Sequence, residues 1–71
     1  MKFQVYLDNA REYRWRLVAR NGQIIADSGE GYATKQNCLN GIALVKTHAA
    51  GAPIEDQTVQ RATAYGSYRS W

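Results

Sequence analysis

Three segments in the first half of the chain alternate apolar and polar residues, the pattern of a strand with one buried face. They cover residues 3–8, 13–20 and 24–28. A turn-rich stretch separates the first two, and Asn21-Gly22 separates the last two. Because Asn-Gly favours a two-residue hairpin loop, the second and third segments should pair antiparallel. The pattern therefore predicts an antiparallel sheet of three consecutive strands.

A two-residue loop at Asn21-Gly22 also fixes a predicted register. It places Val18 opposite Ile25, and the pairing continues in step to Trp15 and Ser28. Opposed residues share a face of the sheet. One predicted face is almost wholly apolar and holds Phe3, Val5, Leu7, Trp15, Leu17, Ala19, Ile24 and Ala26. The other face holds Gln4, Tyr6, Arg14, Arg16, Val18, Arg20, Ile25 and Asp27.

A helical period replaces the alternation after Gly29-Glu30-Gly31. Thr34 suits an N-cap, and the helix is predicted to run from Lys35 to about Ala50, before Pro53. Its apolar stripe consists of Cys38, Ile42, Val45 and Ala49, with Leu39 and Leu44 on its flanks. Neither the stripe nor the apolar sheet face can be buried alone, so the helix should lie across that face. Gly41, at the edge of the stripe, indicates a close approach to the sheet, since glycine weakens a helix.

The predicted domain therefore spans residues 1–58 and has an α+β fold, with a sheet of three to four strands packed on one helix. Ile54 to Val59 is the candidate fourth strand, either at the sheet edge or added to a partner's sheet, which gives the order βββαβ. Residues 59–71 form a polar tail with Tyr65, Tyr68 and Trp71. Three aromatic residues are unusual in a disordered end, so the tail is expected to pack on the domain or on a partner subunit.

A chain of 71 residues buries little surface on folding and usually needs a disulfide, a metal or a second subunit. Its single cysteine, Cys38, has no partner within the chain. Together with the single histidine, His48, it cannot supply a zinc site. A homodimer is the remaining solution and is our prediction, with no metal and no cofactor.

The N-terminal alternation lacks the continuous apolar stretch of a secretory signal, and no apolar run approaches a membrane span. We therefore expect a cytoplasmic protein that does not enter a membrane. Its net charge is +3 with a pI near 9.3, which is a weak indication of nucleic-acid binding.

The polar face of the predicted sheet is the leading candidate for a functional surface. Its members are Tyr6, Arg14, Arg16, Val18, Arg20 and Ile25. Three interpretations stay open for this face. It is a subunit interface with a small apolar centre and an arginine rim. It is a solvated face, with Asp8 beside Arg14 and Asp27 opposite Arg16. Or it binds single-stranded nucleic acid through Tyr6, Arg14, Arg16 and Arg20.

A weaker candidate is an anion site at the start of the helix, formed by Gly29, Gly31, Thr34 and Lys35, because free backbone N–H groups there attract anions. Glu30 and a simple turn argue against it. Cys38 belongs to the apolar stripe and is expected to be a buried, inert thiol. No pair of carboxylates and no Cys–His pair has a spacing suited to catalysis, so we expect no enzyme.

Several runs together resemble the YegP-like family of small bacterial and archaeal proteins of unknown function. These runs are Glu12 to Leu17, Ala19 to Gly22, Gly29 to Tyr32, Asn37 to Ile42 and Ala52 to Asp56. The resemblance covers about residues 3–58 and identifies a single-module member. It implies a ββα-type module with an added strand, which pairs with a second copy in trans or through a tandem repeat. It implies no activity and no catalytic residue, and it does not extend to the aromatic tail.

Overall fold

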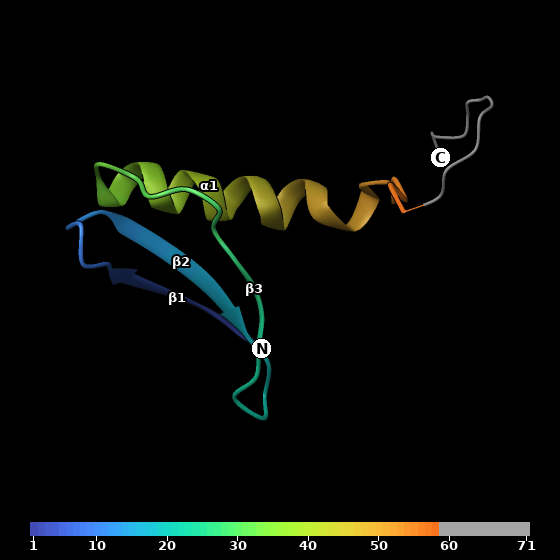
Figure 1. Cartoon of the computed structure of the whole chain (residues 1–71), viewed down its shortest axis with the longest axis horizontal. Coiled ribbons are helices and arrows are strands. Elements are labelled where there is room, and N and C mark those ends of the chain that lie inside the picture. The colour runs from blue at the N-terminus through green and yellow to red at the C-terminus, as the bar shows by residue number, and fades with distance from the viewer. Residues whose placement is uncertain (59–71) are drawn as a thin grey trace.

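Three antiparallel strands and one long helix form the domain in this computed structural model, which describes residues 1–58. The strands are β1 (Lys2–Leu7), β2 (Tyr13–Val18) and β3 (Ile24–Asp27), in the sheet order β1-β2-β3. The helix α1 (Lys35–His48) follows and ends in a short 3₁₀ turn, η1 (Ala49–Gly51). Figure 1 shows α1 lying along one side of the sheet. The predicted α+β fold is confirmed.

The β2–β3 hairpin has a three-residue loop, so the predicted two-residue loop is wrong. The amide of Ala19 donates to the carbonyl of Gln23, and the amide of Gly22 donates to the carbonyl of Ala19. Gly22 alone has a positive φ in this loop, at 89°. These features describe a type I turn followed by a left-handed glycine, a common three-residue hairpin connection.

A β-bulge then restores most of the predicted register. Val18 lies opposite Ile24 rather than Ile25, and the register shifts between Leu17 and Val18. Beyond that point Leu17 lies opposite Ala26, and Arg16 opposite Asp27, as predicted. The extra residue of the bulge compensates for the longer loop. The assignment of Ile24 to the helix side was therefore wrong, because it pairs with Val18 on the other face.

The core forms where α1 crosses β2. Trp15, Cys38 and Ile42 are buried against one another. Around them pack the half-buried Phe3, Val5, Tyr13, Leu17, Tyr32 and Val45. The ring of Phe3 meets Trp15 edge to face, with centroids 5.4 Å apart. The predicted contact between the apolar sheet face and the helix stripe is confirmed.

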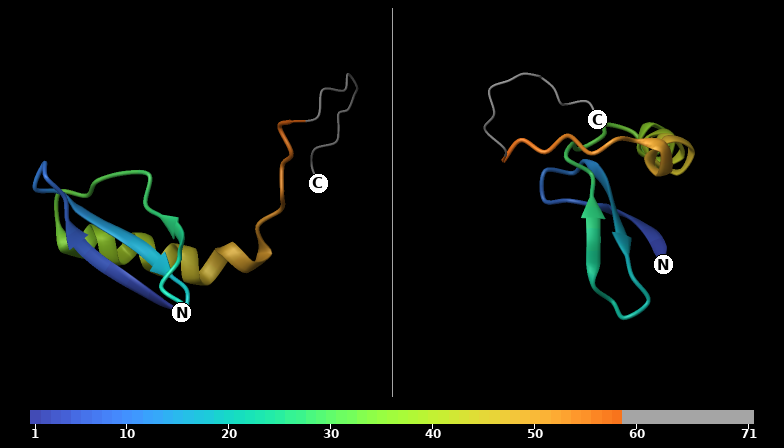
Figure 2. Two further views of the ribbon diagram at one scale, coloured as in Figure 1. Left: turned by 60° about the horizontal axis from the view of Figure 1, so that its bottom comes forward. Right: turned by 90° about the vertical axis from the view of Figure 1, so that its right-hand side faces the viewer.

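The helix begins at its predicted cap, since Thr34 Oγ1 accepts a hydrogen bond of 3.1 Å from the amide of Asn37. After η1 the chain runs extended and away from the sheet (Figure 2). Residues 54–58 form no strand in this structure, so the predicted fourth strand is not formed there. Val59, the last residue of that predicted strand, lies outside the described residues, as does the whole predicted tail, residues 59–71. Within residues 1–58, no helix has both the length and the apolar character to cross a membrane.

Candidate functional site

Tyr6 and Arg16 lie together on the outer face of the sheet, the side turned away from α1. The Arg16 guanidinium carbon stands 4.6 Å from the centroid of the Tyr6 ring. Arg16 Nε also donates a hydrogen bond of 2.9 Å to Gln4 Oε1. Although Asp27 is the cross-strand partner of Arg16, the two form no ion pair. Arg16 is therefore held by an aromatic ring and an amide, and it forms no ion pair within residues 1–58.

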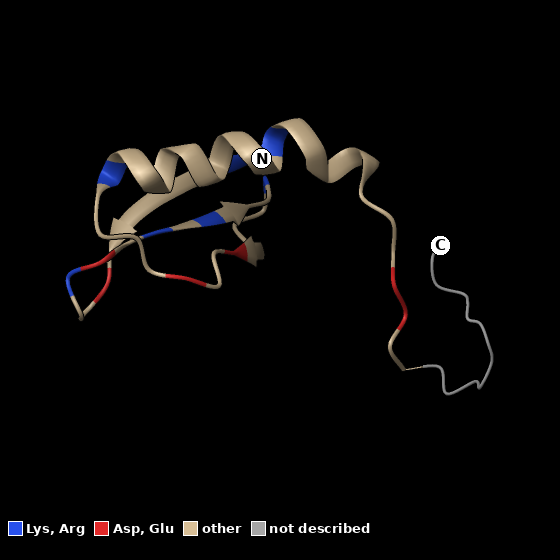
Figure 3. Ribbon diagram, turned by 90° about the horizontal axis from the view of Figure 1, so that it is seen from above, with Lys and Arg blue, Asp and Glu red and all other residues tan. Residues whose placement is uncertain are grey.

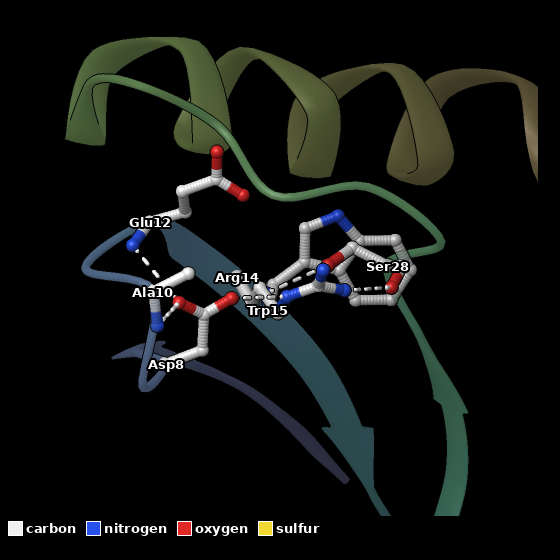
Figure 4. Close-up of polar contacts among 6 residues, drawn as sticks. All are labelled: Asp8, Ala10, Glu12, Arg14, Trp15 and Ser28. Atoms are coloured by element: carbon white, nitrogen blue, oxygen red, sulfur yellow. Dashed lines mark hydrogen bonds and ion pairs between the residues drawn. The ribbon is translucent and has the colours of Figure 1, made fainter.

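Arg14 forms an ion pair with Asp8. The interpretation of a solvated face placed these two residues side by side. Arg14 Nε lies 2.6 Å from Asp8 Oδ2, and Arg14 Nη1 also donates to the carbonyl of Ser28 (Figure 4). Asp8 Oδ1 accepts from the amides of Ala10 and Glu12. These bonds lower the pKa of Asp8, the amide of Glu12 most and Arg14 next. Asp8 in turn raises the pKa of Arg14. This group closes the β1–β2 turn and is structural.

Val18 and Ile25 do not form the apolar centre that an interface on this face would need. Val18 is buried at 8% exposure, while Ile25 is part of the bulge and does not pair with it. A strand of nucleic acid would also lack its stacking surface, because Arg16 covers Tyr6 and Asp8 neutralises Arg14. The geometry therefore favours neither of these two interpretations for the face as a whole.

One end of the outer face is hollowed into an open basin of about 430 Å³. We call it the cationic basin, lined chiefly by Lys2, Gln4, Arg16, Val18, Arg20 and Ile24. Its three cations come from β1, from β2 and from the hairpin loop. Lys2 was missed in the sequence, although its alternation with Gln4 and Tyr6 places it on this face.

The candidate anion site before α1 gains no support from the geometry. Tyr32 extends the sheet there, since its amide and carbonyl both bond to Tyr13 at 2.7 and 2.8 Å. The Glu12 side chain points toward this segment and lies against Gly31 (Figure 4). Lack of a side chain at Gly31 makes room for Glu12, and a carboxylate in that position repels an anion. Thr34 is already used as the helix cap.

A larger hollow, which sequence reasoning missed, lies on the helix side of the sheet. We call it the apolar groove, an open space of about 710 Å³ between β1 and the stretch of α1 and η1 from Leu39 to Ala50. Its apolar lining comprises Met1, Phe3, Val5, Leu17, Leu39, Ile42, Val45, Ala49 and Ala50, and Lys46 and Lys2 also border it. The available sequence signal was Leu39, which lies beside the predicted stripe and widens the apolar face of α1. In the structure Leu39 is exposed, so the sheet does not cover the whole of that face.

The remaining chemically active side chains are not assembled into a site. Cys38 is fully buried, and burial raises the pKa of its thiol. His48 ends α1 and is exposed. No three His, Cys, Asp or Glu side chains within residues 1–58 gather as metal ligands.

Comparison with known proteins shows which family model and which relatives the domain matches. A family model described as a domain of unknown function, DUF1508, matches residues 8–56. A UPF0339 protein of Neisseria meningitidis serogroup B is 48% identical over 56 residues, 79% of this chain and 98% of that protein. A UPF0339 protein of Stutzerimonas stutzeri, described as in the ptx operon 5′ region, is 53% identical over 47 residues, 66% of this chain and 41% of that protein.

A solved structure agrees with these relatives. The NMR solution structure of a protein from Haloferax volcanii matches with a TM-score of 0.75 and 53% identity, over 78% of this chain and 92% of that one. Several segments of the sequence were found to resemble an uncharacterised family of small bacterial and archaeal proteins. This resemblance is confirmed. The relatives to which the chain is similar are named UPF0339 proteins. The chain belongs to the DUF1508 family of domains of unknown function.

Proposed function

We propose that this chain is a non-enzymatic interaction module that works as a homodimer. The observation that carries the proposal is the apolar groove, which leaves one side of the core uncovered. Among the described hydrophobic residues only Trp15, Val18, Cys38 and Ile42 are buried. A core of this size gives marginal stability, and burial of the groove against a second subunit would add to it.

The segment after η1, residues 52–58, is the proposed occupant of the groove of a second copy; it is extended before a turn at residues 57–58. Ile54 is 82% exposed, the highest value among the described large hydrophobic residues. The segment leaves the end of its own helix and makes no strand within its protomer (Figure 2). An apolar side chain on an extended arm and an open apolar groove are complementary, and exchange between two identical chains satisfies both.

Charge and backbone geometry support the same pairing. Glu55 and Asp56 follow Ile54, and the acidic positions of the arm lie beyond the helix in Figure 3. Lys46 stands at the groove and carries the opposite charge. Within the described residues, the outer edge of β1 is also unpaired, because β2 is its one neighbour in the sheet. An extended arm can add to such an edge by main-chain hydrogen bonds, and this also protects the edge from aggregation.

The length of one relative supports the proposal independently. The match to the Stutzerimonas stutzeri protein covers 41% of its length, which leaves room for a second module of the same size. Two modules in one chain would supply the same pairing that two separate chains supply here.

Sedimentation equilibrium tests the proposal. The full chain should sediment at twice 8.0 kDa at micromolar concentration. Ile54→Asp should shift it to the monomer, because a carboxylate cannot enter the groove without a large desolvation penalty. Leu44→Asp is the matched control, since Leu44 is 62% exposed and does not line the groove. It should leave the dimer intact. A monomeric wild-type chain, or an equal response of the two variants, would contradict the proposal.

A further inference from the structure

None of the three cations of the cationic basin forms an ion pair within the described residues, although Asp27 is the cross-strand partner of Arg16. All six acidic side chains of the chain lie within residues 1–58, and the one ion pair formed there joins Asp8 to Arg14. Lys2, Arg16 and Arg20 therefore project around one hollow with no carboxylate among its lining residues. Concentrated positive charge in a concave surface raises the local concentration of anions.

Two contacts fix the orientation of the Arg16 side chain. Its Nε is engaged by Gln4 Oε1, and its guanidinium plane is supported by Tyr6. No other contact uses its two terminal nitrogens within the described residues. A guanidinium in a fixed orientation on a strand can donate two parallel hydrogen bonds to a phosphate, and little side-chain entropy is lost when it does.

The remaining surface of the basin suits an organic group. Buried Val18 and half-exposed Ile24 form an apolar part of the lining, and Gly22 adds no side chain at the mouth. A volume of about 430 Å³ falls in the range of small-ligand sites, about 300–1,000 Å³. We infer that the cationic basin binds a small organic phosphate, with its phosphate at Arg16, Arg20 and Lys2 and its organic part against Val18 and Ile24.

A nucleic-acid strand fits this surface less well. Such a strand needs a charged track with stacking platforms over several nucleotides. Here the charge is confined to one end of the sheet, since Arg14 is neutralised by Asp8 and the Tyr6 ring is covered by Arg16. Asp27, opposite Arg16, places a negative charge where a continuing strand would pass.

This inference is independent of the proposed dimer. The basin lies on the outer face of the sheet, whereas the apolar groove lies on the helix side. Lys2 borders both hollows, so it is unsuitable for separating the two proposals. Arg20 borders the basin alone. The experiment therefore substitutes Arg20. The oligomeric state of the chain can be measured on the same sample.

NMR titration of the ¹⁵N-labelled full chain at low salt, with adenosine 5′-monophosphate and inorganic pyrophosphate as probes, tests the inference. Both should bind saturably and shift the amides of residues 2, 16 and 18–24, and adenosine should not. Arg20→Gln should weaken the binding of both about tenfold, the effect of one charged hydrogen bond. Lys35→Gln removes an exposed cation outside the basin and should leave binding unchanged.

Two results would overturn the inference. An equal loss of affinity in Arg20→Gln and Lys35→Gln would show that the probes sense only the net charge. Binding of a ten-residue thymidine oligonucleotide far more tightly than adenosine 5′-monophosphate, with shifts that extend to Tyr6 and Arg14, would assign the face to nucleic acid instead.

Discussion

The hydroxyl of Tyr32 lies directly against Gly41, at the point where α1 passes over the core. A Cβ at residue 41 would stand 2.5 Å from Tyr32 Oη and 3.0 Å from Tyr32 Cζ. The backbone of Tyr32 is fixed by two hydrogen bonds to Tyr13, so its ring cannot easily withdraw. Glycine at position 41 therefore has a packing reason, although the neighbour is Tyr32 rather than the sheet backbone.

Gly41→Ala should destabilise the domain. Alanine gains about 1 kcal/mol of helix propensity over glycine, whereas overpacking of a core costs about 1–3 kcal/mol. We expect the clash to exceed the gain, with a net loss of about 1 kcal/mol in the free energy of unfolding measured by urea denaturation. In a Tyr32→Phe background, which lacks the hydroxyl, the loss should shrink or reverse. An equal loss in both backgrounds would show that Tyr32 is not the cause.

Ser28→Ala should be more damaging than its size suggests. Ser28 is buried, and its Oγ accepts a hydrogen bond of 3.2 Å from the amide of Trp15 (Figure 4). The change leaves that buried amide without this partner, which costs about 1–3 kcal/mol. Thr47→Ala, at an exposed hydroxyl of α1, is the control and should change the unfolding free energy by under about 0.5 kcal/mol. Similar unfolding midpoints for the two variants would refute the assigned role.

Asp8 should make the domain sensitive to acid. The amide of Glu12 and then Arg14 hold its folded pKa below the ordinary value of 3.8. The stability that Asp8 contributes is therefore present above pH 3.8 and is lost as the pH falls through the lower folded pKa. Asp8→Asn should be less stable than the wild type at pH 7, and the difference should narrow toward pH 2. NMR titration of the Asp8 carboxyl gives the folded pKa directly, and a value at or above 3.8 would contradict the prediction.

Most elements of the fold could be predicted because their signals are local. Alternation gave the three strands, Thr34 gave the helix start, and the apolar stripe gave the contact of α1 with Trp15. The hairpin loop could not be predicted with the same certainty. Asn21-Gly22 is compatible with a two-residue or a three-residue loop, since both place Gly22 at positive φ. Only the bulge on β3, a property of the paired strands, decides between them.

The candidate surfaces were predicted in part. The face assignments of Tyr6, Arg14 and Arg16 follow from strand alternation and agree with the structure. The partner that each charged residue selects does not follow from alternation, since Arg16 binds Gln4 and Tyr6 rather than Asp27. Leu39 indicates a wide apolar face on α1, but the groove itself depends on the angle between α1 and the sheet and on the size of their side chains.

An isotope-filtered NOE measurement tests the exchanged arm most directly. The sample is an equal mixture of chains labelled with ¹³C and ¹⁵N and unlabelled chains, so that only contacts between two chains are detected. We predict intermolecular NOEs from the Ile54 methyl groups to Leu17 and Val45 in the apolar groove. A dimer in which Ile54 shows no intermolecular NOE to the groove, or a chain that remains monomeric at NMR concentration, would contradict the proposed assembly.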